Sequence, residues 1–251
     1  MINTKSLKII KKSSVVALSA VVFASSSATC FAADTPLATR HHEVHRLKHG
    51  TSSNWSGYAA YGSPGSFNSV SANWVQPQVT CDTRTTYSSY WVGLDGYNTN
   101  TVEQLGTEAD CSSGVAKYYA WYEMYPHWGY YINMQVHAGD SFKASVTAQS
   151  RNYYQLKITD VTTGRSFSTT QRLNAQRASA EVVVEAPWSN GTLPLANFGT
   201  ANFTNAQANS LPLGGFSSLD PITMLNPDGS KATPQAFDST KQNFSVTYSA
   251  P

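Results

Sequence analysis

The chain has 251 residues, of which 41% are apolar and only 13% are charged. Charged residues reach about half of the ~25% that is usual in soluble proteins, which excludes a coiled coil, and the apolar content is high enough for a hydrophobic core. Four lysines lie within the first twelve residues, before any acidic residue. Without these lysines, the chain has 13 basic and 15 acidic residues. The composition therefore excludes a protein that binds nucleic acid through basic charge.

The N-terminus has the pattern of an export signal. A basic stretch from Lys5 to Lys12 is followed by the apolar run Val15–Ala24. A run of about ten residues is too short to cross a bilayer, which needs about 20, but it suits the core of a secretory signal. We predict a signal peptide over residues 1–32, cleaved after Ala32 or Ala33. The mature protein should then be secreted to the extracellular space and should have no membrane contact.

Residues 33–50 differ in composition from everything that follows. They contain no aromatic residue and carry four histidines, His41, His42, His45 and His49. We interpret them as a flexible arm or a short pro-segment. The spacing of His41 and His45 would suit a metal ion, but no cysteine or paired carboxylate accompanies them, so we expect no metal site here.

Two cysteines, Cys81 and Cys111, remain after the predicted signal is removed together with Cys30. An even pair in an exported protein usually forms a disulfide. The alternative is a pair of buried free thiols. A disulfide would close a loop of about thirty residues and stabilise the protein by roughly 3–4 kcal/mol.

From residue 51 to residue 251 the sequence predicts one all-β domain. Short segments rich in β-branched and aromatic residues follow one another, and several alternate apolar with polar positions. They are 70–76, 88–95, 118–125, 132–138, 141–149, 153–161, 180–186 and 244–249. Residues 170–179 are the only candidate for a short helix, or equally for a loop. Many short strands with few helices indicate an antiparallel β-sandwich or barrel.

Several catalytic signatures are missing from the sequence: it has no G-x-S-x-G, H-E-x-x-H, P-loop or G-x-G-x-x-G segment. Carboxylates and amides on strands remain as candidates. If residues 180–186 form a strand, Glu181, Val183 and Glu185 share one face, which is either a solvated rim or a catalytic surface. In the segment 101–107, Glu103 and Gln104 would point to opposite faces.

Six segments, in this order, resemble the glutamic peptidase (eqolisin, peptidase family G1) family, and they span most of the chain after the arm. They are S-N-W-S-G-Y (53–58), W-V-G-L-D-G (91–96), E-Q-L-G (103–106), A-W-Y-E-M-Y-P (120–126), A-E-V-V-V-E (180–185) and F-G-T-A-N-F-T-N-A (198–206). The chain looks like a bacterial-type member, because E-Q-L-G replaces the L-Q-T-G of fungal members and needs a one-residue gap before it. The resemblance implies a concanavalin A-like (jelly-roll) sandwich of two antiparallel sheets.

The resemblance also implies a catalytic pair, Gln104 and Glu185, which activates a water molecule for acid hydrolysis of peptide bonds. No covalent intermediate, metal or other cofactor is implied. Further positions of the matched segments are expected to orient the pair or to bind substrate, although each aromatic one would equally suit the core: Trp55, Trp91, Asp95, Trp121, Tyr122 and Glu123. We expect protein or peptide substrates, no nucleic acid partner, and a monomer.

A second class of function competes with the peptidase. A lectin-like carbohydrate-binding sandwich, or a retaining glycoside hydrolase on the same fold, would use paired carboxylates such as Glu123, Glu181 and Glu185. Retaining hydrolysis needs the two carboxyl groups about 5–5.5 Å apart. Assays of protein hydrolysis in acid and of polysaccharide hydrolysis or binding would separate the two classes.

Overall fold

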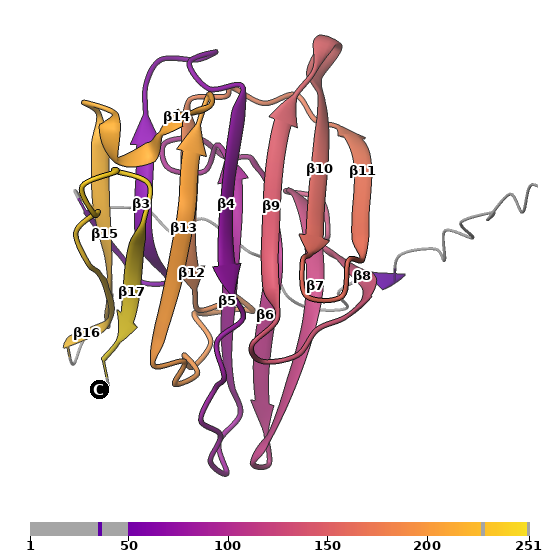
Figure 1. The fold of residues 1–251 in the computed structure, drawn as a ribbon, viewed down its shortest axis with the longest axis vertical. Coiled ribbons are helices and arrows are strands. Elements are labelled where there is room, and N and C mark those ends of the chain that lie inside the picture. The colour runs from indigo at the N-terminus through magenta and orange to yellow at the C-terminus, as the bar shows by residue number, and fades with distance from the viewer. Residues whose placement is uncertain (1–34, 37–49, 227–228, 250–251) are drawn as a thin grey trace, which may run out of the picture. The chain divides into compact units, whose positions relative to one another are not determined.

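The computed structural model describes residues 35–36, 50–226 and 229–249. The predicted signal peptide and most of the predicted arm lie outside these residues. The described part consists of β-strands, two single-turn 3-10 helices and their connections (Figure 1). Nearly all strand pairs are antiparallel; the one named parallel pair joins β2 and β15. The expectation of an all-β antiparallel fold is therefore confirmed.

The strands form two hydrogen-bonded sheets that share β15, and we call these sheets ladder 1 and ladder 2. Ladder 1 runs in spatial order through β15 (Leu219–Asn226), β3 (Trp55–Tyr61), β12 (Ser179–Glu185), β5 (Thr86–Leu94), β6 (Val102–Ser112), β7 (Val115–Tyr125) and β8 (Tyr130–Gln135). Two short strands lie at its margins, where β1 (Thr35–Pro36) pairs with β8 and β2 (Thr51–Ser52) pairs with β15.

Ladder 2 carries most of the strands that are labelled in the foreground of Figure 1. Its spatial order is β11 (Ser166–Arg172), β10 (Tyr153–Asp160), β9 (Ser141–Ala148), β4 (Ser69–Val75), β13 (Thr200–Ala208), β17 (Phe244–Tyr248), β16 (Gly229–Pro234) and β15. The short β14 (Leu211–Pro212) pairs with the end of β13. The 3-10 turns are η1 (Ser150–Asn152) and η2 (Leu213–Gly215).

The main hydrophobic core lies between the two ladders. Strands β4, β9 and β10 of ladder 2 contact β5, β6 and β12 of ladder 1. Alternating side chains of both ladders fill the space between them, as period-two strands require. In β10, for example, Tyr154, Leu156 and Ile158 are buried while the residues between them are more exposed. We call the side of ladder 1 that contributes to this core its inner face, and the opposite side its outer face.

Residues 170–179 contain no helix. Strand β11 extends to Arg172, and an irregular connection leads from there to β12. Ser166–Arg172 pairs only with β10, so it is an edge strand whose side chains alternate between partly buried and exposed. The polar residues that made a short helix possible from the sequence are those of a solvent-exposed edge strand.

The predicted disulfide between Cys81 and Cys111 is present. Cys111 lies near the end of β6 and is fully buried, while Cys81 lies in the connection between β4 and β5. The bond ties this connection to ladder 1 across a sequence separation of 30 residues. No helix in the described part of the chain is long and apolar enough to cross a membrane.

Replacing both cysteines with serine (C81S/C111S) should lower the free energy of unfolding by roughly 3–4 kcal/mol, because the unfolded chain regains the freedom that a thirty-residue loop removes. Urea unfolding followed by circular dichroism would measure the change. A reducing agent should destabilise the parent protein and leave the double variant unchanged. Equal stability of the two proteins would contradict this account of the bond.

Candidate active site

The strand register of ladder 1 brings the two predicted catalytic residues to its outer face. Glu185 of β12 pairs with Ser89 of β5, and Ser89 pairs with Glu108 of β6. Gln104 of β6 lies four positions further along, in the row that also contains Gly93 and Glu181. Directly paired residues of an antiparallel sheet project to the same side. Gln104, Glu181 and Glu185 therefore share this face, and the common side of Glu181 and Glu185 is the one that the alternation in 180–186 predicted.

The carboxyl group of Glu185 is fully buried and accepts hydrogen bonds on both oxygens. The side-chain amide of Asn54 donates to Oε1 over 3.0 Å, and the indole Nε1 of Trp91 donates to Oε2 over 2.8 Å. Trp55 lies directly opposite Glu185 in the β3–β12 pair, and its indole packs edge-on against Trp91. The carboxyl group thus has a fixed orientation between two tryptophans.

The indole of Trp91 connects the surroundings of Glu185 with those of Gln104. Its Nε1 binds Glu185, while its ring carbon Cζ3 lies over Gly93: a Cβ atom added to Gly93 would come within 2.8 Å of it. The same added Cβ would lie 3.2 Å from the Cβ of Gln104. One indole therefore spans the space between the two predicted catalytic residues.

The amide of Gln104 is oriented by a neighbouring carboxylate. Its Nε2 donates a hydrogen bond of 3.0 Å to Oε2 of Glu123, the residue directly opposite in the β6–β7 pair. Both side chains are fully buried. Because a carboxylate oxygen can accept a hydrogen bond only from the amide nitrogen, this contact distinguishes Nε2 of Gln104 from its Oε1.

Asp95 holds the start of β12, the strand that carries Glu185, against the end of β5. It follows β5 in a left-handed conformation, with φ of 67°, and its carboxylate accepts the backbone N–H groups of Arg177 and Ala178 over 2.6 and 2.8 Å. Its own N–H donates to the carbonyl of Ser179, the first residue of β12. Asp95 therefore positions the start of β12 against the end of β5.

The register separates the remaining predicted residues into two groups. Trp121 lies on the outer face, in the row of Trp91, and its Nε1 donates to Ser89 Oγ over 3.0 Å. Tyr122 lies on the inner face, where it stacks on Tyr130 and Phe167 in the main core. The structure therefore brings Trp55, Trp91, Trp121 and Glu123 together with the pair, and it places Tyr122 on the other side of the sheet.

Sequence reasoning missed two polar residues of this face. Asn54, the partner of Glu185, precedes the strand β3 and lies within the S-N-W-S-G-Y segment, which is the signal that would have identified it. Glu108 is fully buried and shares the row of Glu185, with Ser89 between them. Glu108 lies four residues after Gln104 in β6, and the alternation of a strand places residues at this spacing on the same face.

Burial raises the pKa of several carboxyl groups around the site. The pKa of Glu185 is raised well above its usual value by loss of solvent, although the donors around it favour the charged form. Loss of solvent also raises the pKa of Glu181, with a smaller contribution from the nearby Asp95. On the inner face the pKa of Glu103 is raised for the same two reasons, against smaller opposing contributions from the Thr101 side chain and Arg177.

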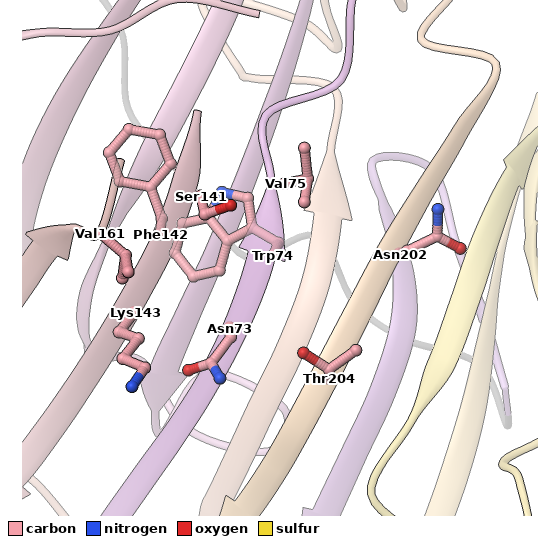
Figure 2. A pocket seen from close by; sticks show the side chains of 9 residues that line it. All are labelled: Asn73, Trp74, Val75, Ser141, Phe142, Lys143, Val161, Asn202 and Thr204. Carbon is pink, nitrogen blue, oxygen red and sulfur yellow. The ribbon is translucent and has the colours of Figure 1, made fainter. Parts of the chain in front are cut away.

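A pocket of about 280 Å³ lies elsewhere, on ladder 2 (Figure 2). Asn73, Lys143 and Thr204 line it from three adjacent strands, and no carboxylate takes part. It contains neither Gln104 nor Glu185, so it is separate from the candidate site. Among the residues that the structure describes, no cluster of His, Cys, Asp or Glu is arranged to hold a metal ion.

Comparison with known proteins identifies the family. The sequence profile of the Peptidase A4 family matches residues 53–248, so the chain belongs to this family. Aspergillopepsin-2 of Aspergillus niger is 33% identical over 172 residues, which cover 64% of this chain and 59% of that protein. Scytalidopepsin B of Scytalidium lignicola is 32% identical over 172 residues, which cover 63% of this chain and 64% of that protein. The chain thus spans about three fifths of the length of these relatives.

Solved structures show the same fold. A scytalido-glutamic peptidase bound to a peptide-based transition state analog superposes with a TM-score of 0.66 at 25% identity, covering 78% of this chain and 98% of that one. The aspergilloglutamic peptidase from Aspergillus niger gives a TM-score of 0.57 at 27% identity, covering 65% and 99%.

Replacing Glu103 with glutamine should stabilise the protein at neutral pH and leave it unchanged in acid. A carboxyl group whose pKa is raised by folding keeps its proton in the folded state while the unfolded chain releases it above about pH 4.5, so stability falls as the pH rises from there. Glutamine removes this loss. Thermal unfolding at about pH 3 and pH 7 would measure it.

Asp82→Asn is the matched control for Glu103→Gln. The side chain of Arg84 holds the pKa of Asp82 below its usual value, so this substitution should give no gain at neutral pH. A gain in both variants, or in neither, would contradict the assignment of Glu103 as a group that folding keeps protonated.

Proposed function

We propose that this member of the peptidase A4 family is a secreted glutamic endopeptidase that hydrolyses protein or peptide substrates in acid. The observation that carries the proposal is the pair itself: a buried carboxyl group and an oriented amide on one face, spanned by the Trp91 indole. The likeness to enzymes whose structures contain transition-state analogs supports it. The catalytic unit comprises residues 51–251, works as a monomer and has the two-sheet sandwich architecture of the family.

In the proposed reaction, ionised Glu185 acts first as a general base. It removes a proton from a water molecule held between Glu185 and Gln104, and the oxygen of this water attacks the scissile carbonyl carbon. The amide of Gln104 stabilises the negative charge that develops on the carbonyl oxygen. Protonated Glu185 then donates its proton to the leaving nitrogen, the C–N bond breaks, and the carboxylate is regenerated. No metal or cofactor takes part in these steps.

The environment of Glu185 suits both of its roles. A base that must later donate the same proton works best when its pKa lies near the working pH. Burial raises the pKa of Glu185, and the donors Asn54 and Trp91 oppose this rise by stabilising the anion. Burial and these donors therefore act on the pKa of Glu185 in opposite directions, and burial is the larger of the two effects.

The other residues of the face act through the pair. Glu123 accepts one N–H of the Gln104 amide nitrogen, so that in the proposed reaction the second N–H of the same nitrogen donates to the oxyanion, and Trp91 fixes the carboxylate of Glu185. Asp95 holds the start of β12 and thereby the position of Glu185 along the sheet. Trp55 and Trp121 form apolar walls beside the pair, where an extended peptide would lie.

The competing assignment as a retaining glycoside hydrolase has less support than the peptidase. The Peptidase A4 profile matches residues 53–248, and Glu181 and Glu185 lie four residues apart on one strand. Glu123 is engaged by the amide of Gln104. Retaining hydrolysis needs carboxyl groups about 5–5.5 Å apart.

Gln104 and Glu185 should act as one unit. Glu185→Gln keeps the size of the side chain but cannot transfer a proton, so peptide hydrolysis should fall to background while the circular dichroism spectrum stays unchanged. Gln104→Ala should lower kcat by roughly 10²–10³. Because both changes disable the same step, the double variant should be little worse than either single one.

Glu181→Gln is the control for these measurements, since Glu181 lies on the same strand and face but outside the pair. It should retain far more activity than Glu185→Gln. A Glu185→Gln protein that folds and still digests casein in acid at a near-normal rate would refute the proposed function.

Trp91→Phe should shift the acid limb of the pH profile of kcat/KM to higher pH. The Trp91 N–H stabilises ionised Glu185, so its removal raises the pKa of this carboxyl group further, and the base form appears only at higher pH. Trp121→Phe is the matched control, because its N–H donates to Ser89 instead. Equal shifts in both variants, or none in Trp91→Phe, would mean that Trp91 does not tune the base.

A further inference from the structure

Ladder 2 turns a surface of hydroxyl and amide groups away from the main core. Trp74, Phe142 and Phe203 of its central strands point into the core, so the residues that alternate with them point outward. In the strands β11, β10, β9, β4, β13 and β17 these outward positions carry serine, threonine, asparagine or glutamine, apart from three cations, Tyr153 and Val75. We call this surface the polar face.

The charges of the polar face are all positive. Its cations Lys143, Lys157 and Arg172 are exposed, whereas the one acidic residue of these six strands, Asp160, is buried and held by the turn that follows it. Lys157 lies opposite Ser145, two positions from Lys143, so the two lysines are diagonal neighbours about 7–8 Å apart. Like charges on neighbouring strands repel each other, and an anion bound between them would offset this repulsion.

Two adjoining hollows give the polar face the shape of a binding site. The hollow of about 280 Å³ beside Lys143 (Figure 2) shares Asn202 and Thr204 with a second hollow of about 270 Å³. The shared residues join the two into one depression that crosses β9, β4, β13 and β17. Ligand sites in proteins usually have volumes of about 300–1,000 Å³, a size that the two hollows reach together.

The lining of the first hollow combines polar groups in a row with apolar groups beside them. Thr204, Asn73 and Lys143 are paired directly across three adjacent strands, and they present a hydroxyl, an amide and an ammonium group on one side of the sheet. Val75 and Val161 line the same hollow, each with 49% exposure. The two ion pairs found among the described residues join other side chains, so Lys143 has no carboxylate partner there. A sugar ring has the matching composition, with hydroxyl groups at its edge and C–H groups on its faces.

Other polyanions match the polar face less well. Sites for single-stranded nucleic acid stack bases on aromatic side chains, but Tyr153, the exposed aromatic residue of this face, lies at the opposite end of β10 from Val161. Two valines are also a much smaller apolar surface than a membrane-binding face presents. Asp238, the carboxylate that lines the second hollow, is occupied by hydrogen bonds from Thr240 and Asn243 of its own loop. The lining therefore favours a carbohydrate that carries negative charge.

We propose that the polar face of ladder 2 binds an acidic polysaccharide, one whose sugar units carry carboxylate groups. A sugar carboxylate lies between Lys143 and Lys157, hydroxyl groups of the chain bond to Asn73 and Thr204, and ring C–H groups contact the two valines. The proposal is independent of the peptidase function, because no residue of the outer face of ladder 1 takes part. It gives the protein a second surface, which holds it on an anionic carbohydrate while Gln104 and Glu185 lie on the other ladder.

Binding to polygalacturonic acid, a polymer of sugar carboxylates, tests the proposal without using activity. Isothermal titration calorimetry with the intact protein near neutral pH, where these carboxyl groups are ionised, should show binding. The methyl ester of the same polymer keeps the sugar chain but has no charge, and it should not bind. Equal binding of both polymers, or of neither, would overturn the proposal. Binding of single-stranded DNA or of anionic lipid vesicles at least as tight as that of polygalacturonic acid would also overturn it.

Variants of the polar face test the position of the site. Lys143→Glu should weaken the binding of polygalacturonic acid roughly 10- to 100-fold, which corresponds to the loss of one hydrogen bond to a charged group. Asn73→Ala removes an amide without changing the charge and should weaken it roughly 2- to 10-fold. An unchanged affinity of either variant would overturn the assignment of this hollow.

Lys117→Glu is the matched control for Lys143→Glu. Lys117 is also an exposed lysine of a strand, but it lies in β7 of ladder 1, and its substitution changes the net charge by the same amount. This variant should bind the polymer as the parent does; equal weakening in both variants would mean that net charge alone attracts the polymer, and would overturn the proposal. Peptide cleavage by the same proteins reports only on the proposed function, so that a failure of either proposal is visible by itself.

Discussion

Burial of the Glu185 carboxyl group is the constraint on which the arrangement of this protein depends. A carboxylate without solvent is stable only when hydrogen bonds replace the lost water. Here the replacements are the amide of Asn54 and the indole of Trp91, which come from the segment before β3 and from β5. Strand β12 lies between β3 and β5 in the ladder. The charged form of Glu185 is therefore supported only when three segments that are distant in the sequence pair in one register.

The geometry of Trp91 explains the glycines of the neighbouring segments. Because its indole points along the sheet toward Gln104, a side chain on Gly93 would collide with the ring. A Cβ on Gly106, which is paired with Trp91 in β6, would come within 2.1 Å of the carbonyl of Tyr90 and 2.6 Å of the Cβ of Trp91. Asp95 then closes the W-V-G-L-D-G segment by capping the start of β12. This segment thus contains the Trp91 N–H that donates to Glu185, the glycine that leaves space for the Trp91 indole, and the aspartate that positions β12.

The sequence was sufficient for the features that depend on local periodicity. The alternation in 180–186 predicted that Glu181, Val183 and Glu185 share a face, and an extended 101–107 predicted that Glu103 and Gln104 point apart; the register confirms both. The sequence failed where the outcome depends on which strands become neighbours. Tyr122 is an aromatic residue of a matched segment, but its position in the alternation of β7 places it on the inner face. Asn54 reaches Glu185 only because β3 pairs with β12. Residues 170–179 were ambiguous because an exposed edge strand carries the same polar residues as a short surface helix.

Burial raises the pKa of carboxyl groups on both faces of ladder 1. On the outer face the raised pKa of Glu185 suits the proposed reaction, in which this group returns the proton that it takes. On the inner face burial also raises the pKa of Glu103, against smaller opposing contributions from the Thr101 side chain and Arg177, so its ionisation opposes folding. Glu103 and Gln104 are adjacent in β6, and the strand that places the amide in the site therefore also places the carboxyl group between the ladders. A rising pH ionises both buried carboxyl groups, and each ionisation lowers the free energy of unfolding. The proton that the proposed base must release is therefore one that the folded state holds more tightly than the unfolded chain does.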